Sequence, residues 1–303
     1  MKRIEVWADM VCTWAHVGRQ RLVRAGFGED VEVVWRPHQL DPTAPREQDH
    51  DATAPANGPT WGATSPPNTF DAHRVIAVAL DRGGPALQDA VVGRILDAHF
   101  TEGADIGDPA VLAALAEDAG LDGVAEALAA GEGTEQVRHQ LLRGKALGIG
   151  TSPTFVVGDR AVTGAQSPEA LRDLVRQAAP GRDLPEEVTR LRHAESLLDA
   201  RDPLGALEML RPLLDEHGDD PTVALLAARA YFGSAQLGRA RQVLEALVER
   251  APGDHYARFL LGRTLERANR PEEALPHLRL AAAMSAEPDY ADAVRRVERR
   301  GAA

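Results

Sequence analysis

The sequence predicts a chain of two domains, an α/β domain with a helical insertion followed by an all-α solenoid. Its 303 residues are about twice the length of a common domain. The first part alternates short β-branched runs with helical patterns, which is typical of a mixed sheet. The last part repeats its residue spacing with a period of 34, which is typical of stacked helical pairs. We therefore divide the chain into residues 1–184 and 185–303.

The α/β domain is expected to begin with a strand over 4–8, followed by a helical pattern through 19–24 and a second strand over 31–36. The polar stretch 41–67 is rich in Pro, Ala and Thr, and we interpret it as a long loop.

A helical pattern then runs to Leu147, and we take residues 68–148 as an insertion of about four helices. After it, two apolar runs flank Gly158 and Asp159, which predicts a β-hairpin, and Ser167 with Pro168 opens a last helix. The order β, α, β, helices, β, β, α describes a thioredoxin-type sheet with an interrupting helical lobe.

The solenoid is predicted by residues that recur 34 positions apart. Small residues at such offsets let paired helices approach closely, and large ones fill the space between pairs. The recurring sets are Ala194, Ala228 and Gly262; Leu197, Tyr231 and Leu265; Ala206, Ala240 and Ala274; and Leu210, Leu244 and Leu278. The spacing resembles three tetratricopeptide repeats, over about 187–220, 221–254 and 255–288, with a capping helix after them.

The composition limits the partners. Hydrophobic residues make up 44% of the chain and aromatic residues 4%, which suits helices packed through Ala, Leu and Val. The formal net charge of −12 disfavours phosphate-driven binding. We expect protein, peptide or small-molecule partners, no nucleic acid and no membrane. The chain lacks a long apolar run and a secretory pattern at its start, so we expect a cytoplasmic protein.

Cys12 is the one cysteine, so an intramolecular disulfide is excluded. It lies at the expected junction of the first strand and its helix. Amide N–H groups and the dipole at a helix start stabilise a thiolate, so a cysteine there is poised to attack. A small structural cysteine in the core is the alternative, and position alone leaves both open.

The second motif is the segment 151–155, TSPTF, directly before the hairpin. Proline cannot donate a ladder hydrogen bond, so Pro153 predicts a tight junction that is compatible with a cis peptide bond. The backbone of Ser152 would then be able to pair with an extended peptide.

Several segments in order resemble the DsbA-like thioredoxin superfamily, in particular its cytosolic FrnE-type branch. The resemblance covers about residues 3–178 and rests on IEVWADMVCTWAHVG, VEVVWRPHQLDP, NTFDAHR, AHFTEGADIGD and GTSPTFVVGDRAVTGAQSPEAL. The C-P-W-C motif of that branch corresponds here to Cys12, Thr13, Trp14 and Ala15, so the nucleophile is retained and the resolving thiol is absent. The cis-proline of the family corresponds to Pro153.

The resemblance implies thiol–disulfide exchange, in which one thiolate attacks and a second thiol releases the mixed disulfide. With Ala15 in the second place, release needs an external thiol, either a small one or a cysteine of the partner. We expect no tightly bound cofactor, with a low-molecular-weight thiol as the candidate co-reactant. We expect no metal site, because the His and Cys spacings fit none.

The predicted substrate-binding residues are Trp14, His16, Asn68, His73, Arg74, Ser152 and Pro153. Trp14 is expected either to shield the sulfur and pack on a substrate or to enter the core. His16 is a donor near Cys12 or a solvated residue at the helix start. The resemblance implies that the Asn68 to Arg74 motif borders the groove, whereas capping by Asn68 or Thr69 explains part of it without function.

The predicted partner-binding residues of the solenoid are Arg229, Phe232, Tyr256, Phe259 and Arg263, by analogy with the repeat family. Arg229 and Arg263 lie one period apart, so two guanidinium groups would face an acidic segment. The alternative is a solvated face on which they pair with Glu195 and Glu266.

We expect a DsbA/FrnE-like oxidoreductase-type protein that uses Cys12 with an external thiol, with the repeats as a module for protein–protein interaction. One alternative is a redox-degenerate, chaperone-like module that binds clients, laid out like the chaperedoxins. The other is a thiol-cofactor-dependent isomerase or transferase, similar to the 2-hydroxychromene-2-carboxylate isomerases.

Overall fold

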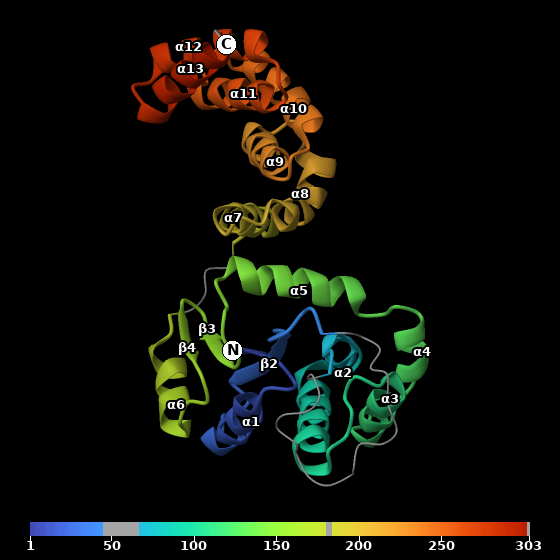
Figure 1. Cartoon of the computed structure of the whole chain (residues 1–303). Coiled ribbons are helices and arrows are strands. Elements are labelled where there is room, and N and C mark those ends of the chain that lie inside the picture. The colour runs from blue at the N-terminus through green and yellow to red at the C-terminus, as the bar shows by residue number, and fades with distance from the viewer. Residues whose placement is uncertain (45–66, 180–183, 302–303) are drawn as a thin grey trace. The chain divides into compact units, whose positions relative to one another are not determined.

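The structure is a computed structural model that describes residues 1–44, 67–179 and 184–301. It divides into two compact units, Met1–Asp183 and Leu184–Ala303 (Figure 1). Most of the loop predicted over 41–67 lies outside the described residues. Each unit is described by itself.

The first unit is built on a four-stranded sheet with the order β2-β1-β3-β4. Its strands are β1 (Lys2–Ala8), β2 (Val31–Pro37), β3 (Thr154–Val157) and β4 (Arg160–Thr163). β1 pairs in parallel with β2 and antiparallel with β3, and β3 and β4 form the predicted hairpin. The helix α1 (Thr13–Ala25) connects the parallel strands, and α6 (Pro168–Gln177) follows the hairpin. The thioredoxin-type order is therefore confirmed.

The insertion between β2 and β3 is helical, as predicted. It contains α2 (Phe70–Asp97), the π-helix η1 (Ala98–Glu102), α3 (Pro109–Asp118), α4 (Val124–Ala129) and α5 (Thr134–Ala146). The helical pattern of the sequence is broken at residues 83–85, and the structure has a kink at this place. Gly84 has φ 71° and ψ −170°, and the helix resumes at Pro85, where a missing N–H is tolerated in a first turn.

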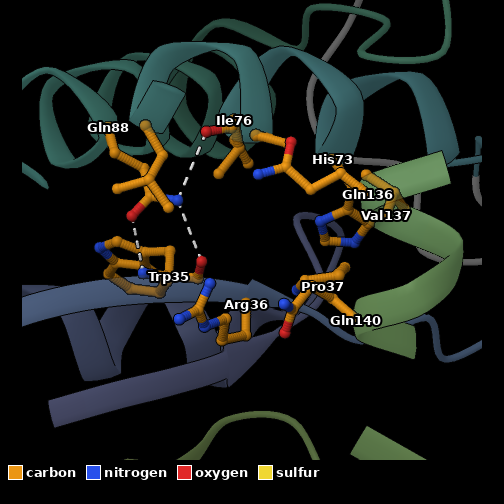
Figure 2. A pocket seen from close by; sticks show the side chains of 11 residues that line it. Trp35, Arg36, Pro37, His73, Ile76, Gln88, Gln136, Val137 and Gln140 are labelled. Atoms are coloured by element: carbon orange, nitrogen blue, oxygen red, sulfur yellow. Dashed lines mark hydrogen bonds between the residues drawn. The ribbon is translucent and has the colours of Figure 1, made fainter. Parts of the chain in front are cut away.

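Gln88 of α2 fastens the insertion to the edge of the sheet. Its side-chain oxygen accepts the Trp35 N–H at 2.9 Å, and its amide nitrogen donates to the Trp35 carbonyl at 3.0 Å. The Gln88 side chain thus pairs with the backbone at the free edge of β2, as a neighbouring strand would (Figure 2). This contact fixes α2 above the carboxyl end of the parallel strands.

Glu5 holds α5 against the sheet. Its carboxylate accepts from Arg36 of β2 at 2.9 Å and from both terminal nitrogens of Arg143 of α5, at 2.9 and 2.7 Å. Burial raises the pKa of the Glu5 carboxyl, but Arg143 and Arg36 outweigh it and leave that pKa below its ordinary value. The last turn of α5 is therefore fixed just before the loop that carries Ser152.

The second unit consists of three helical pairs and a final helix. They are α7 (Glu186–Asp199), α8 (Pro203–His217), α9 (Pro221–Gly233), α10 (Leu237–Arg250), α11 (His255–Arg267), α12 (Pro271–Met284) and α13 (Pro288–Gly301). A Cβ atom on Gly262 would lie 2.6 Å from Leu278 Cγ, so this small residue allows the close approach that the 34-residue period predicts. The all-α fold is confirmed.

Candidate active site around Cys12

Cys12 lies where the chain turns from β1 into α1. It occupies the N-cap position of α1 with an extended backbone, and its N–H donates to the Asp9 carbonyl at 3.1 Å. Amide groups of a first helical turn have no partner within their own helix, so they favour an anionic sulfur beside them. Cys12 is 6% exposed, so it is a buried residue.

Ser152 and Pro153 form the facing wall. The peptide bond between them is cis, and the Cys12 thiol donates to the Ser152 carbonyl oxygen at 3.3 Å. A Cβ atom on Gly18 of α1 would lie 3.2 Å from the Pro153 ring, so the absence of a side chain there lets α1 approach the proline. The structure thus brings together three residues that the sequence singles out far apart.

Trp14 and His16 differ in their surroundings. The Trp14 side chain is 61% exposed, so the alternative of a core position is wrong. His16 contacts Gln20 at 3.0 Å and lies 3.7 Å from an Asp97 oxygen, with the Phe100 ring 5.3 Å away. Its imidazole therefore has neighbours on α1, α2 and η1, and the thiol is not among these contacts.

The residues Asn68, His73 and Arg74 of the motif predicted to border the groove are all buried, and the contacts of Asn68 and Arg74 are structural. Asn68 donates to the Ala44 carbonyl and accepts the N–H of Phe70, the first residue of α2, whose N-cap position is Thr69. Arg74 donates to the carbonyl oxygens of Leu128 and Glu132 and to Asp71, so its guanidinium holds α2 against the segment around α4. These two side chains have structural partners in place of a substrate.

Asp9 is a residue at this site to which the sequence analysis gave no role. Asp9 is 1% exposed, its N–H donates to Ser152 Oγ at 2.9 Å, and its Oδ2 accepts the Leu40 N–H at 2.6 Å. His73 Nε2 lies 3.8 Å from Asp9 Oδ1. One sequence feature could have indicated Asp9: an aspartate at the carboxyl end of a strand, three residues before the cysteine.

The two arginines predicted to bind a partner of the solenoid pair with carboxylates of the same unit. Arg229 lies 3.6 Å from oxygens of both Glu195 and Asp199, and Arg263 lies 3.1 Å from a Glu266 oxygen. This is the solvated, paired face that the sequence analysis held as its alternative.

The aromatic residues of the same face also have internal contacts. Phe259 stacks on Tyr290 of α13 with ring centroids 4.2 Å apart, and the Arg267 guanidinium lies over the Phe232 ring. Tyr256 stays exposed at the rim of a cavity of about 420 Å³ that also reaches Arg229.

The described residues contain no group of three or more His, Cys, Asp or Glu side chains placed to hold a metal ion. Within the same residues, no helix has both the length and the apolarity that a membrane span requires.

A comparison with protein families gives a result that agrees with the strand order, the cis-proline and the cysteine at the start of α1. A family described as DSBA-like thioredoxin domain matches residues 3–176, more than half of the chain. The chain belongs to the DSBA-like thioredoxin family. A second family, described as tetratricopeptide repeat, matches residues 197–260, so this DSBA-like protein carries a tetratricopeptide module.

Individual relatives are distant. The uncharacterized protein YwbO of Bacillus subtilis strain 168 is 30% identical over 184 residues, which cover 54% of this DSBA-like chain and 90% of the relative. The probable DsbA oxidoreductase SCO1869 from Streptomyces coelicolor is 24% identical, with a TM-score of 0.49, over 61% of this chain and 94% of the other. The cytosolic disulfide reductase DsbM from Pseudomonas aeruginosa, solved with GSH, is 22% identical, with a TM-score of 0.43, over 57% and 93%.

Proposed function

We propose that the protein catalyses thiol–disulfide exchange with Cys12 as its single nucleophile and an external thiol as the resolving group. The observation that carries the proposal is the Cys12 thiol at 3.3 Å from the Ser152 carbonyl, beside the cis-proline and at the start of α1. The thiol is held in one orientation, and the helix start favours its anion. The reducing cytosol is the setting we propose, because it supplies the thiol.

The reaction has two steps. The Cys12 thiolate attacks one sulfur of a disulfide R–S–S–R′, the bond between the two sulfurs breaks, and R′ leaves as a thiolate. An external thiolate then attacks the R sulfur of the mixed disulfide, and Cys12 leaves with the electron pair of that bond. The net reaction exchanges one thiol for another, and Cys12 returns to its starting state.

The substrate is proposed to be a disulfide within or attached to an extended peptide. Loss of the thiol proton would end the hydrogen bond from Cys12 and leave the Ser152 carbonyl ready to accept a peptide N–H. Trp14 is exposed two residues from the nucleophile and offers an apolar surface beside it.

The absence of a resolving thiol gives the sharpest test, because Ala15 can be changed to cysteine. Wild type is treated with a disulfide-containing peptide and no free thiol, and Cys12→Ser and Ala15→Cys are compared with it. We expect wild type to stop at the mixed disulfide, Cys12→Ser to form none, and Ala15→Cys to release the peptide and keep an internal disulfide. Addition of glutathione should release the peptide from wild type.

Three outcomes would contradict the proposal. These are an absence of adduct on folded wild type, an adduct on Cys12→Ser, and a mixed disulfide that excess glutathione leaves intact. The matched control is Thr13→Ser, since it keeps a hydroxyl at an exposed position beside Cys12. Gly164→Ala would be a poor control, because Gly164 has φ 77°, a backbone conformation that strains alanine.

The solenoid supports a second candidate function, the binding of protein clients independently of Cys12. Tetratricopeptide repeats generally mediate protein–protein interaction, and here a cavity of about 420 Å³ opens between α7 and α9. Leu191, Leu225 and Leu226 line it together with Arg192, Glu195 and Arg229, and Arg229 is paired with Glu195 and Asp199. The three leucines suit an apolar segment of a peptide.

Client binding predicts that Cys12→Ala protein still suppresses aggregation of a denatured test protein, and that Leu225→Glu weakens the suppression. Equal suppression by Leu225→Glu and wild type, with the helical content of both unchanged, would contradict a role for this cavity.

A further inference from the structure

Glu266, in the last turn of α11, is surrounded by more positive charge than it can balance. Its side chain is 7% exposed, and its carboxylate accepts from Nε and Nη2 of Arg296 on α13, at 2.6 and 2.8 Å. Arg263 Nε lies 3.1 Å from one of its oxygens, and Arg300 Nη1 lies 3.8 Å from the other. Among the residues that the structure describes, these three arginines form no ion pair with a second carboxylate. Three guanidinium groups thus share one negative charge.

These charges are present throughout the neutral pH range. The hydrogen bonds from Arg296, together with the charges of the three arginines, hold the pKa of the Glu266 carboxyl below its ordinary value, although burial opposes them. Arginine side chains stay protonated in proteins. The site therefore has an excess of two positive charges, in a chain whose formal net charge is −12.

The nearest carboxylates of α13 are engaged elsewhere. Asp292 pairs with Arg295 and acts on Arg296 only over a longer distance. Glu298 lies 2.7 Å from Arg279 of α12. Neither carboxylate neutralises the excess charge beside Glu266.

Arg263 is held in place, but its hydrogen bonding is incomplete. Its guanidinium carbon lies 5.9 Å from the centre of the Phe259 ring, which stacks on Tyr290 of α13. Its Nε is buried and has no hydrogen-bond partner within the described residues, although Glu266 is close. Buried donors without an acceptor are rare in folded proteins. The side chain as a whole is 35% exposed, so its outer atoms are accessible to a ligand.

The excess charge and the arrangement of the donors fit a phosphate monoester. Such a group carries close to two negative charges at pH 7 and three terminal oxygens. Arg263 of α11 and Arg300 of α13 approach the same carboxylate, so they are close enough to share one phosphate. Guanidinium groups bind phosphate oxygens through paired hydrogen bonds. A carboxylate has one charge, so it would leave the second positive charge unbalanced.

We propose that Arg263 and Arg300 bind a phosphoserine or phosphothreonine side chain of a partner protein, while Glu266 and Arg296 hold α11 and α13 together beneath it. A protein is the source we infer, because the site lies in the solenoid that contains the tetratricopeptide repeats, and such repeats generally mediate protein–protein interaction. This binding needs neither Cys12 nor the cavity between α7 and α9.

Binding of degenerate phosphopeptides to the full chain tests the proposal. Three fluorescein-labelled mixtures of short peptides carry phosphoserine, serine or glutamate at the central position and every residue except cysteine elsewhere. Fluorescence anisotropy gives the affinity of each mixture. We expect the phosphoserine mixture to bind about tenfold more tightly than the other two, because it alone supplies two charges to the arginines. Its affinity should fall as salt is raised, since salt screens these charges.

Arg263→Gln and Arg300→Gln should each weaken binding of the phosphoserine mixture about tenfold, because each removes a charged donor. The two side chains are 35% and 65% exposed, so we expect both variants to fold. Arg295→Gln is the matched control, since Arg295 lies on the same helix as Arg300, is 62% exposed and pairs with Asp292. It should bind like wild type. Circular dichroism verifies the helical content of each variant.

Four outcomes would overturn the proposal. The phosphoserine mixture could bind no better than the serine or the glutamate mixture, or it could bind wild type, Arg263→Gln and Arg300→Gln equally. Calorimetry could show saturable binding of inorganic phosphate while the phosphoserine mixture fails to bind, which would make this a site for a free anion. Binding of single-stranded RNA in place of the peptides would assign the arginines to nucleic acid.

Discussion

The Cys12 sulfur and the Ser152 carbonyl oxygen lie 3.3 Å apart, although 140 residues separate them in the sequence. The register of the sheet explains this contact. Trp7 of β1 faces Thr154 of β3 in an antiparallel pair, so the chain leaving β1 and the chain entering β3 emerge at the same edge. Cys12 and the cis-proline are therefore brought together by strand pairing, with the helical insertion between them in sequence.

Ser152→Ala is expected to destabilise the first unit by about 1–3 kcal/mol, because the buried Asp9 N–H loses its acceptor. Urea unfolding followed by tryptophan fluorescence measures this unit alone, since all four tryptophans precede residue 62. Thr151→Ala is the control, because the exposed Thr151 uses only its carbonyl in a hydrogen bond. Equal losses in the two variants would contradict the assigned role of Ser152.

Glu5→Gln is expected to cost the first unit about 3 kcal/mol, because it leaves two partly buried guanidinium groups without their anion. Glu32→Gln provides the comparison, since the pair of Glu32 with Arg3 lies at the surface and should cost below about 1 kcal/mol. The same fluorescence-monitored unfolding gives both values. A smaller loss for Glu5→Gln than for Glu32→Gln would show that α5 is held by other contacts.

Gly262→Ala is expected to destabilise the solenoid by about 1–3 kcal/mol, because its Cβ would press on Leu278. Gly238→Ala should be neutral or stabilise by up to about 1 kcal/mol, since open space surrounds that helical position. All three tyrosines lie in the solenoid, so tyrosine fluorescence reports on its unfolding. Similar losses in both variants would contradict the close helix contact.

The repeats were the most predictable part of the chain, because period and helix pairing depend on local spacing. Ala194, Ala228 and Gly262 indicated the helix contacts directly. The cis peptide bond at Pro153 and the position of Cys12 at a helix start were also anticipated from the sequence. Arg74 and Asn68 were misplaced, because a motif gives the position of a polar side chain but not the carbonyl groups that surround it. Asp9 was missed since its partners come from α2, η1 and the loop after β2, which only the tertiary fold brings together.

The stability of the first unit should fall as pH drops below about 6.5. Burial lowers the pKa of His38, His73 and His99 in the folded state, so the unfolded chain binds more protons there. Their contribution to stability is fully present above the pKa of histidine in the unfolded chain. It is lost as the pH falls towards the lower pKa values of the folded state. The melting temperature followed by tryptophan fluorescence should decrease from pH 7 to pH 5, less steeply in His73→Gln. A flat profile in wild type would show that these histidines are not buried as neutral rings.

The most direct measurement is the intact mass of the folded protein after incubation with glutathione disulfide and then with excess free thiol. The account predicts one glutathione per chain on wild type, none on Cys12→Ser, and full return to the unmodified mass after the thiol is added. Wild type that stays unmodified while folded, but is modified once denatured, would contradict the claim that Cys12 is a working nucleophile.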